Sequence, residues 1–212
     1  KQVSKFIWGA VPRSGKSFMI GGLISNRFKR PENKKNDIVI ILGAKTETES
    51  QFVKMFKAFD DFSGYNIYVG GKTKQDAQVA GNPTIYLFSQ EYLKDKCVWN
   101  ADVSTSTFKE KEGKDLDLKK RFEGRNIDLY FDEIHKGGST DNSQSVIYTF
   151  KNNKVGINMF IMVTATFAKP SAKYEGLNFI GSGNSKTVTI EWSYNDQQHM
   201  KKINDATKLE MF

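Results

Sequence analysis

The chain has almost no cysteine. Cys97 is the single one among 212 residues, so neither an internal disulfide nor a thiolate metal cluster can form. A zinc centre would also need more ligands than the two histidines add. Such cysteine usage is typical of proteins in a reducing compartment. A chain of this length can bury a sizeable core without such cross-links.

Long apolar runs and a leader segment are missing as well. No run approaches the roughly 20 residues that a membrane-spanning helix requires. Residues 1–10 lead straight into a strand-like segment and lack the charged-then-apolar pattern of a signal peptide. We therefore expect a soluble, intracellular protein with no membrane partner.

Arginine is scarce although the chain is basic. Only five of the 32 basic residues are arginines, while the net charge is +8. Basic chains often bind polyanions such as nucleic acids. An AT-rich coding sequence gives the same lysine, asparagine and isoleucine bias whatever the function, so the charge alone does not separate a nucleic-acid surface from an ordinary solvated one.

Short apolar runs alternate along the chain with amphipathic or polar stretches. The runs are continuously apolar, as strands buried on both faces of a parallel sheet require. Between them, residues 16–28 and 50–59 carry apolar side chains at helical spacing. This alternation predicts a doubly wound α/β domain, with a mostly parallel central sheet and helices on both faces. The predicted strands are residues 6–10, 37–42, 65–69, 84–89, 127–131, 157–163 and 187–192.

Residues 95–126 interrupt the alternation. They are highly charged and indicate an insertion within the domain, with a short helix near residues 116–122. A further helix is expected near residues 196–206. The chain opens a few residues before its first motif and ends without a stop-like feature, so we expect residues 1–212 to be one domain of a longer protein.

The first motif is a phosphate loop of sequence Ala-Val-Pro-Arg-Ser-Gly-Lys-Ser at residues 10–17. It follows a predicted strand and opens a predicted helix, whose N–H groups and dipole favour a bound phosphate. Gly15 permits close approach of the backbone, Lys16 reaches the terminal phosphates, and Ser17 offers a hydroxyl to Mg²⁺. The predicted ATP-binding residues are Ala10, Val11, Pro12, Arg13, Ser14, Gly15, Lys16, Ser17 and Phe18.

The second motif is an acidic pair, Asp132 and Glu133, at the end of the apolar run 127–131. In an open parallel sheet, ligands bind at the carboxyl ends of strands. Asp132, with Ser17, is expected to hold Mg²⁺ through water, and Glu133 to orient and polarise the attacking water. Acids often end strands without any such role, so this prediction depends on the phosphate loop. Lys16 completes the predicted catalytic set.

Three motifs, in this order, resemble motifs I, II and III of superfamily 2 helicases. They are residues 10–17, Asp-Glu-Ile-His at 132–135, which is of the DEAH/DExH kind, and Thr-Ala-Thr at 164–166. The loop, with alanine where the usual first glycine stands, is similar to those of helicase-type ATPases of large DNA viruses and of restriction or phage motors. The resemblance covers roughly residues 5 to 168 and implies the first RecA-like domain of an ATP-driven helicase or translocase.

The resemblance also implies partners and further roles. The track would be a nucleic acid, with DNA favoured over RNA, and the location the cytoplasm or viral factory of a host cell. A second RecA-like domain of the same polypeptide would supply arginines that stabilise the transferring phosphoryl group, so this chain alone should hydrolyse ATP slowly. Coupling to that domain would involve His135, Thr164 and Thr166. Backbone contacts to nucleic acid would involve Lys45, Thr46, Thr48, Ser89 and Gln90.

Two other classes of protein remain open. A nucleotide kinase, or another P-loop enzyme acting on a small molecule, would share the phosphate loop. Such enzymes usually lack a Thr-Ala-Thr strand end after an Asp-Glu pair, and no lid arginines are evident. A nucleic-acid-binding module with a relict ATP site is the other alternative, against which the intact Lys16, Ser17, Asp132 and Glu133 argue.

Overall fold

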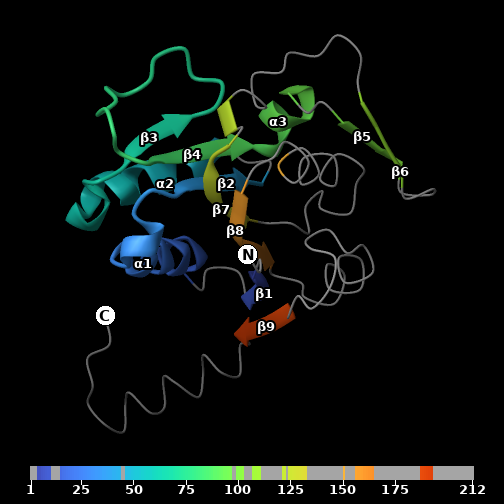
Figure 1. Ribbon diagram of the computed structural model, residues 1–212, viewed down its shortest axis with the longest axis horizontal. Coiled ribbons are helices and arrows are strands. Elements are labelled where there is room, and N and C mark those ends of the chain that lie inside the picture. The colour runs from blue at the N-terminus through green and yellow to red at the C-terminus, as the bar shows by residue number, and fades with distance from the viewer. Residues whose placement is uncertain are drawn as a thin grey trace, which may run out of the picture.

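A seven-stranded sheet forms the centre of the computed structural model, which describes residues 4–10, 15–43, 46–96, 99–102, 107–110, 121–122, 124–132, 150, 156–164 and 187–192 (Figure 1). The strand order is β3-β4-β2-β7-β8-β1-β9, and every pairing within this sheet is parallel. The strands are β1 Ser4–Ala10, β2 Asp37–Leu42, β3 Asn66–Val69, β4 Thr84–Ser89, β7 Asn126–Phe131, β8 Gly156–Thr164 and β9 Thr187–Trp192.

Three α-helices are described. They are α1 Lys16–Phe28, α2 Thr46–Ala58 and α3 Gln90–Lys96, and short 3₁₀ turns cover Pro31–Asn33 and Asp60–Phe62. The predicted α/β domain with a mostly parallel sheet is confirmed, and each predicted strand has its observed counterpart within two residues at either end. In the described part of the chain no helix is long and apolar enough to cross a membrane.

Two predictions about local structure were wrong. Helix α2 begins at Thr46 and not at residue 50, because a first turn of hydroxyl and acidic residues favours a helix start without contributing apolar side chains. Within residues 95–126, where only a helix was predicted, β5 (Trp99–Asp102) and β6 (Thr107–Glu110) form an antiparallel pair. Of the predicted helix 116–122, residues 121–122 are described and helical; the predicted helix 196–206 lies outside the described residues.

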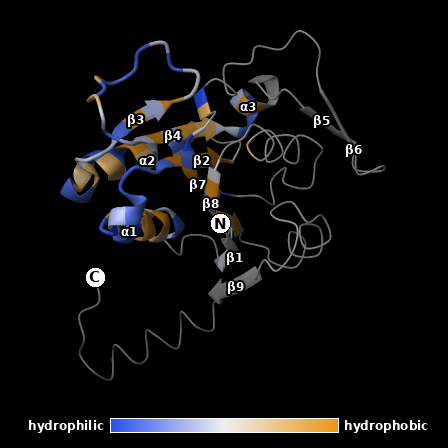
Figure 2. Ribbon diagram, in the orientation of Figure 1, coloured by the Kyte–Doolittle hydropathy of each residue, from blue (hydrophilic) through white to orange (hydrophobic). Residues whose placement is uncertain are grey.

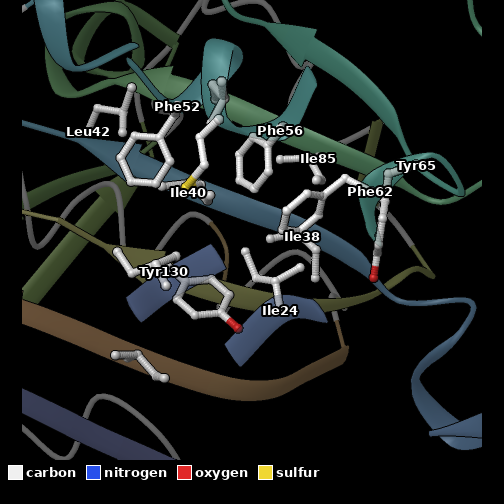
Figure 3. Close-up of a cluster of buried hydrophobic side chains, with 14 of the residues drawn as sticks. Ile24, Ile38, Ile40, Leu42, Phe52, Phe56, Phe62, Tyr65, Ile85 and Tyr130 are labelled. Carbon is white, nitrogen blue, oxygen red and sulfur yellow. The ribbon is translucent and has the colours of Figure 1, made fainter. Parts of the chain in front are cut away.

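The sheet is buried on both faces. Successive residues of β2 alternate between two clusters: Ile38, Ile40 and Leu42 belong to one, and Val39 and Ile41 to the other. The first cluster lies beneath α1 and α2 (Figure 3), whereas Leu93 of α3 covers the second with Phe122 and Phe150. Figure 2 shows the apolar residues concentrated in the central strands and on one side of α1 and α2. This two-sided burial explains why the strands read as continuous apolar runs.

A buried ion pair fixes α1 to the sheet. Arg27, in the last turn of α1, donates from Nε to Oδ2 of Asp128 at 2.7 Å and from Nη2 to Oδ1 at 3.1 Å. The Asp128 side chain is 1% exposed and that of Arg27 is 19% exposed. Burial alone would lower the pKa of Arg27, but the hydrogen bonds and charge of Asp128 outweigh it, so the pKa is raised. The guanidinium therefore stays charged against β7.

A second charged network joins the amino ends of three strands. Oδ2 of Asp37, at the start of β2, accepts a hydrogen bond from Nη1 of Arg125 at 2.7 Å, just before β7. Its Oδ1 accepts the N–H of Thr84, the first residue of β4, at 2.8 Å. One buried carboxylate thus fixes the mutual position of β2, β4 and β7 at this edge.

Arg27→Met should lower the free energy of unfolding by about 3 kcal/mol, because it leaves the Asp128 carboxylate buried without its cation. Urea denaturation would measure the change. The matched control is Lys57→Ala, since the Lys57–Asp76 pair (3.0 Å) is 54% exposed on both sides and should contribute no more than about 1 kcal/mol. Equal losses in the two variants would contradict the anchoring role.

Tyr130→Phe should keep or raise stability. Tyr130 belongs to the cluster beneath α1 and α2, and its hydroxyl has no hydrogen-bond partner among the described residues, which costs about 1–3 kcal/mol. Burial, and then the charge of Asp128, raise the pKa of Tyr130 well above its ordinary value of 10.0. The folded chain thus keeps a proton that the unfolded chain loses above that pH, and wild-type stability should fall more steeply there than that of the variant. A less stable variant at neutral pH would reveal a hidden partner.

Candidate nucleotide site

The carboxyl ends of the parallel strands meet at one edge of the sheet, called here the carboxyl edge. In the register, Trp8 of β1 lies level with Val163 of β8, and Phe131 of β7 lies level with Met162. Asp132, one residue after Phe131, is therefore level with Val163 and Trp8. The end of the first motif's strand and the acidic residue lie at the same edge, with only β8 between them.

The first turn of α1 reaches the same edge. Arg27, near the end of α1, contacts Asp128, four residues before Asp132, a rise of about 13 Å along β7. Lys16 lies 11 residues before Arg27, a rise of about 16 Å along the helix. Since α1 returns from the end of β1 to the start of β2, it runs opposite to the strands. Its first turn therefore projects at or slightly beyond the level of Asp132.

Gly15 shapes the start of α1. It has φ 78° and ψ 26°, the left-handed region, and it is the N-cap residue without a side-chain capping hydrogen bond. The first backbone hydrogen bond of the helix runs from the Met19 N–H to the Gly15 carbonyl, so the helix offers no acceptor to the N–H groups of Ser17 and Phe18. A left-handed residue followed by right-handed ones also turns successive N–H groups toward one point, a concavity that suits an anion.

Asp132 is the acidic member of the site. It is 3% exposed, and its N–H donates to the Ile41 carbonyl of the neighbouring β2 at 2.8 Å. Side chains two residues apart on a strand face the same side of the sheet. Asp128 and Tyr130 of β7 face α1, and Asp132 continues this alternation. This places a buried carboxylate on the side of the sheet that α1 covers.

The spacing between β1 and β7 suits a polyphosphate. Two inter-strand steps separate them, which is about 10 Å. Thr164 ends β8 in this interval, level with Gly9. Mg²⁺ takes oxygen ligands, keeps several waters and shares phosphate oxygens, so one hydroxyl from Ser17 and one carboxylate from Asp132 form a suitable donor set. The described residues contain no group of three or more acidic, histidine or cysteine side chains that would hold a metal ion without phosphate.

Part of the predicted site lies outside the described residues. These positions are Val11, Pro12, Arg13, Ser14, Lys45, Glu133, His135 and Thr166. Ala10 is the last residue of β1, and Phe18 lies in the first turn of α1 with 64% of its surface exposed. The structure thus brings the predicted Ala10, Gly15, Lys16, Ser17, Thr164 and Asp132 to the carboxyl edge.

Four predicted nucleic-acid residues lie in junctions that differ from the predicted loops. Thr46 and Thr48 are in the first turn of α2 rather than in a strand-end loop. Ser89 ends β4 directly before α3, and its Oγ accepts the N–H of Tyr92 at 3.0 Å, so it caps that helix. Gln90 begins α3, and its Nε2 is buried without a hydrogen-bond partner within the described part of the chain. All four lie at or after the ends of strands that reach the carboxyl edge, since Leu42 is level with Ser89.

Arg27 and Asp128, which position the site, were missed in the sequence. The available signal was Asp128 itself, an acid inside the otherwise apolar run 127–131. A carboxylate buried in a sheet requires a partner, so its presence there indicates a cation on a covering helix. The spacing of Arg27 within α1 would then have identified the partner.

Gly15→Ala and Gly22→Ala should change stability in opposite directions. Neither added Cβ meets an atom within 4 Å, so steric clash does not separate them. Alanine at position 15 must adopt the left-handed region at a cost of about 1–2 kcal/mol, whereas alanine inside α1 at position 22 should stabilise by about 1 kcal/mol. Thermal denaturation of both variants would test this. A neutral Gly15→Ala would show that the loop does not need a left-handed residue.

Comparison with other proteins adds no assignment. Neither the models of known protein families nor the sequences of curated proteins give a match to this chain. Its function therefore has to be argued from the chemistry and geometry of the site, because an α/β fold by itself hosts many activities.

Proposed function

We propose that this chain is a RecA-like P-loop domain that binds and hydrolyses ATP with Mg²⁺ as part of a helicase or translocase. One observation carries the proposal. The Arg27–Asp128 pair directs the first turn of α1 to the edge where Asp132 follows β7, so the residues of motifs I and II can act on one nucleotide. Residues 1–212 would be one domain of the motor, and the second RecA-like domain would complete its site.

The proposal gives each of these residues a role. Lys16 neutralises the terminal phosphates, and backbone N–H groups around Gly15 hold the phosphate chain. Ser17 and Asp132 hold Mg²⁺, which would neutralise charge on the phosphate oxygens. Glu133, next to Asp132, orients the attacking water and takes its proton. A phosphoryl transfer site works mainly by such positioning and charge stabilisation.

The motor assignment rests on the shared edge. Helices α2 and α3 begin where β2 and β4 end, and this brings Thr48, Ser89 and Gln90 to the edge that carries Asp132. The hydroxyl groups of Thr48 and Ser89 are suited to bind phosphate oxygens of a DNA or RNA backbone without reading its sequence, whereas the Gln90 amide nitrogen is buried. DNA is the favoured track. ATP turnover and nucleic-acid contact at one edge of the same sheet can affect each other directly.

Two substitutions separate binding from catalysis. Lys16→Ala removes the charge on the terminal phosphates, so MgATP binding should be lost. Glu133→Gln keeps the size of the side chain but not its basicity, so binding should persist while turnover falls at least about 100-fold. Calorimetry and a phosphate-release assay measure the two properties. Lys29→Ala, an exposed lysine just beyond α1, is the matched control and should change neither.

Polynucleotide stimulation distinguishes the motor from its alternatives. ATPase activity would be measured with and without single-stranded DNA or RNA, on the polypeptide extended beyond Phe212. Strong stimulation supports the motor. Turnover that needs a small phosphate acceptor would indicate a kinase, and no turnover would indicate a binding module with a relict site. Wild-type turnover in Glu133→Gln would refute the catalytic assignment.

A further inference from the structure

Two phenylalanines lie exposed beside the first turn of α1. Phe18 is 64% exposed and Phe59, directly after α2, is 49% exposed. Their ring centroids are 6.4 Å apart with an interplanar angle of 88°, an edge-to-face pair. In such a pair, each ring keeps at least one face that the other does not cover. A pair of large apolar side chains held together in solvent forgoes the stabilisation that burial would give.

The position of Phe18 connects this pair to the nucleotide site. It follows Ser17 in the first helical turn, and Ile20, two residues later, is fully buried against the sheet. Two residues rotate about 200° around a helix, so Phe18 points away from the sheet while its N–H belongs to the group that faces the phosphates. The pair therefore lies beside the helix turn that is proposed to bind the phosphates, on the side away from the sheet.

We propose that Phe18 and Phe59 form a stacking surface for the base of the bound nucleoside triphosphate. The inference rests on the proposed function, because the phosphates held at Gly15–Ser17 tether the base within reach of the first turn. A nucleobase offers a flat face that stacks on an uncovered aromatic ring, and every base has such a face. Stacking alone does not read the base edge. The site should therefore accept all nucleoside triphosphates with similar affinity.

Binding of the 212-residue chain to ATP, GTP, UTP and inorganic tripolyphosphate, each with Mg²⁺, tests the inference by calorimetry. The wild type should bind the three nucleotides within about threefold of each other and about tenfold more tightly than tripolyphosphate, the gain expected for one stacked base. Phe18→Ala should lower the affinity for every nucleotide by that factor of about ten. It should leave the affinity for tripolyphosphate unchanged. Phe18→Trp should restore the affinity for nucleotides, and Phe59→Ala should lose part of it.

Val79→Ala is the matched control. Val79 is 59% exposed and lies in the segment between β3 and β4, where its backbone N–H, unaffected by the substitution, donates to Asn66 Oδ1. The variant should bind every ligand like the wild type, and a nucleotide loss equal to that of Phe18→Ala would overturn the assignment to this pair.

The outcomes separate this inference from the proposed function. If wild-type protein binds tripolyphosphate as tightly as ATP, the stacking surface is refuted while the phosphate site stands. If Phe18→Ala weakens tripolyphosphate as much as the nucleotides, the side chain acts on the loop and the inference is likewise refuted. The same holds if Phe18→Ala weakens nothing, as expected if the pair docks another protein surface. If the wild type binds neither ATP nor tripolyphosphate, the proposed function fails and the inference with it.

Discussion

The bidentate contact between Arg27 and Asp128 determines where the first turn of α1 lies. A helix resting on a sheet through apolar contacts alone can slide or rotate at small cost, because such contacts have no direction. A partly buried guanidinium paired with a buried carboxylate has one favourable geometry, and any displacement leaves the buried carboxylate uncompensated. The pair lies at the far end of α1, yet it sets the height of Lys16 relative to Asp132. A candidate nucleotide site is thereby positioned by residues that do not belong to it.

The two edges of the sheet are built differently. At the amino edge, Asp37 binds Arg125 and the Thr84 N–H, and Asp128 binds Arg27, so charged contacts join the strands to one another and to α1 there. At the carboxyl edge, Asp132 is buried directly after β7, and α1 begins at Gly15 without a side-chain capping hydrogen bond. Rigidity concentrated at one edge allows the other to combine a left-handed glycine, a helix terminus and a buried acid, features that suit anion and metal binding better than stability.

Most of the architecture followed from periodicity. Continuous apolar runs such as 37–42 predicted strands buried on both faces, and the two clusters that alternate along β2 account for that signal. The strand order did not follow, because pairing β1 with β8 and β9 depends on contacts between residues far apart in the chain. The first turn of α2 and the β5–β6 pair were missed since polar, charged segments carry no apolar period. Gly15 and Lys16 could be proposed as site residues from the local sequence alone. That Asp132 lies at the same edge of the sheet depends on the strand order, which the sequence did not predict.

The strand order gives the motifs a physical relation that their spacing in sequence does not show. Residues 10–17, 132 and 164 are scattered over more than two thirds of the chain, yet β8 lies between β1 and β7. Thr164 therefore ends the strand that separates the phosphate loop from the acidic residue. In the proposed motor, a change at the terminal phosphate would alter the charge on both sides of this strand end at once. Thr164 would then pass the state of the nucleotide to whatever contacts the carboxyl edge, which is the coupling that a motor requires and a simple binding module does not.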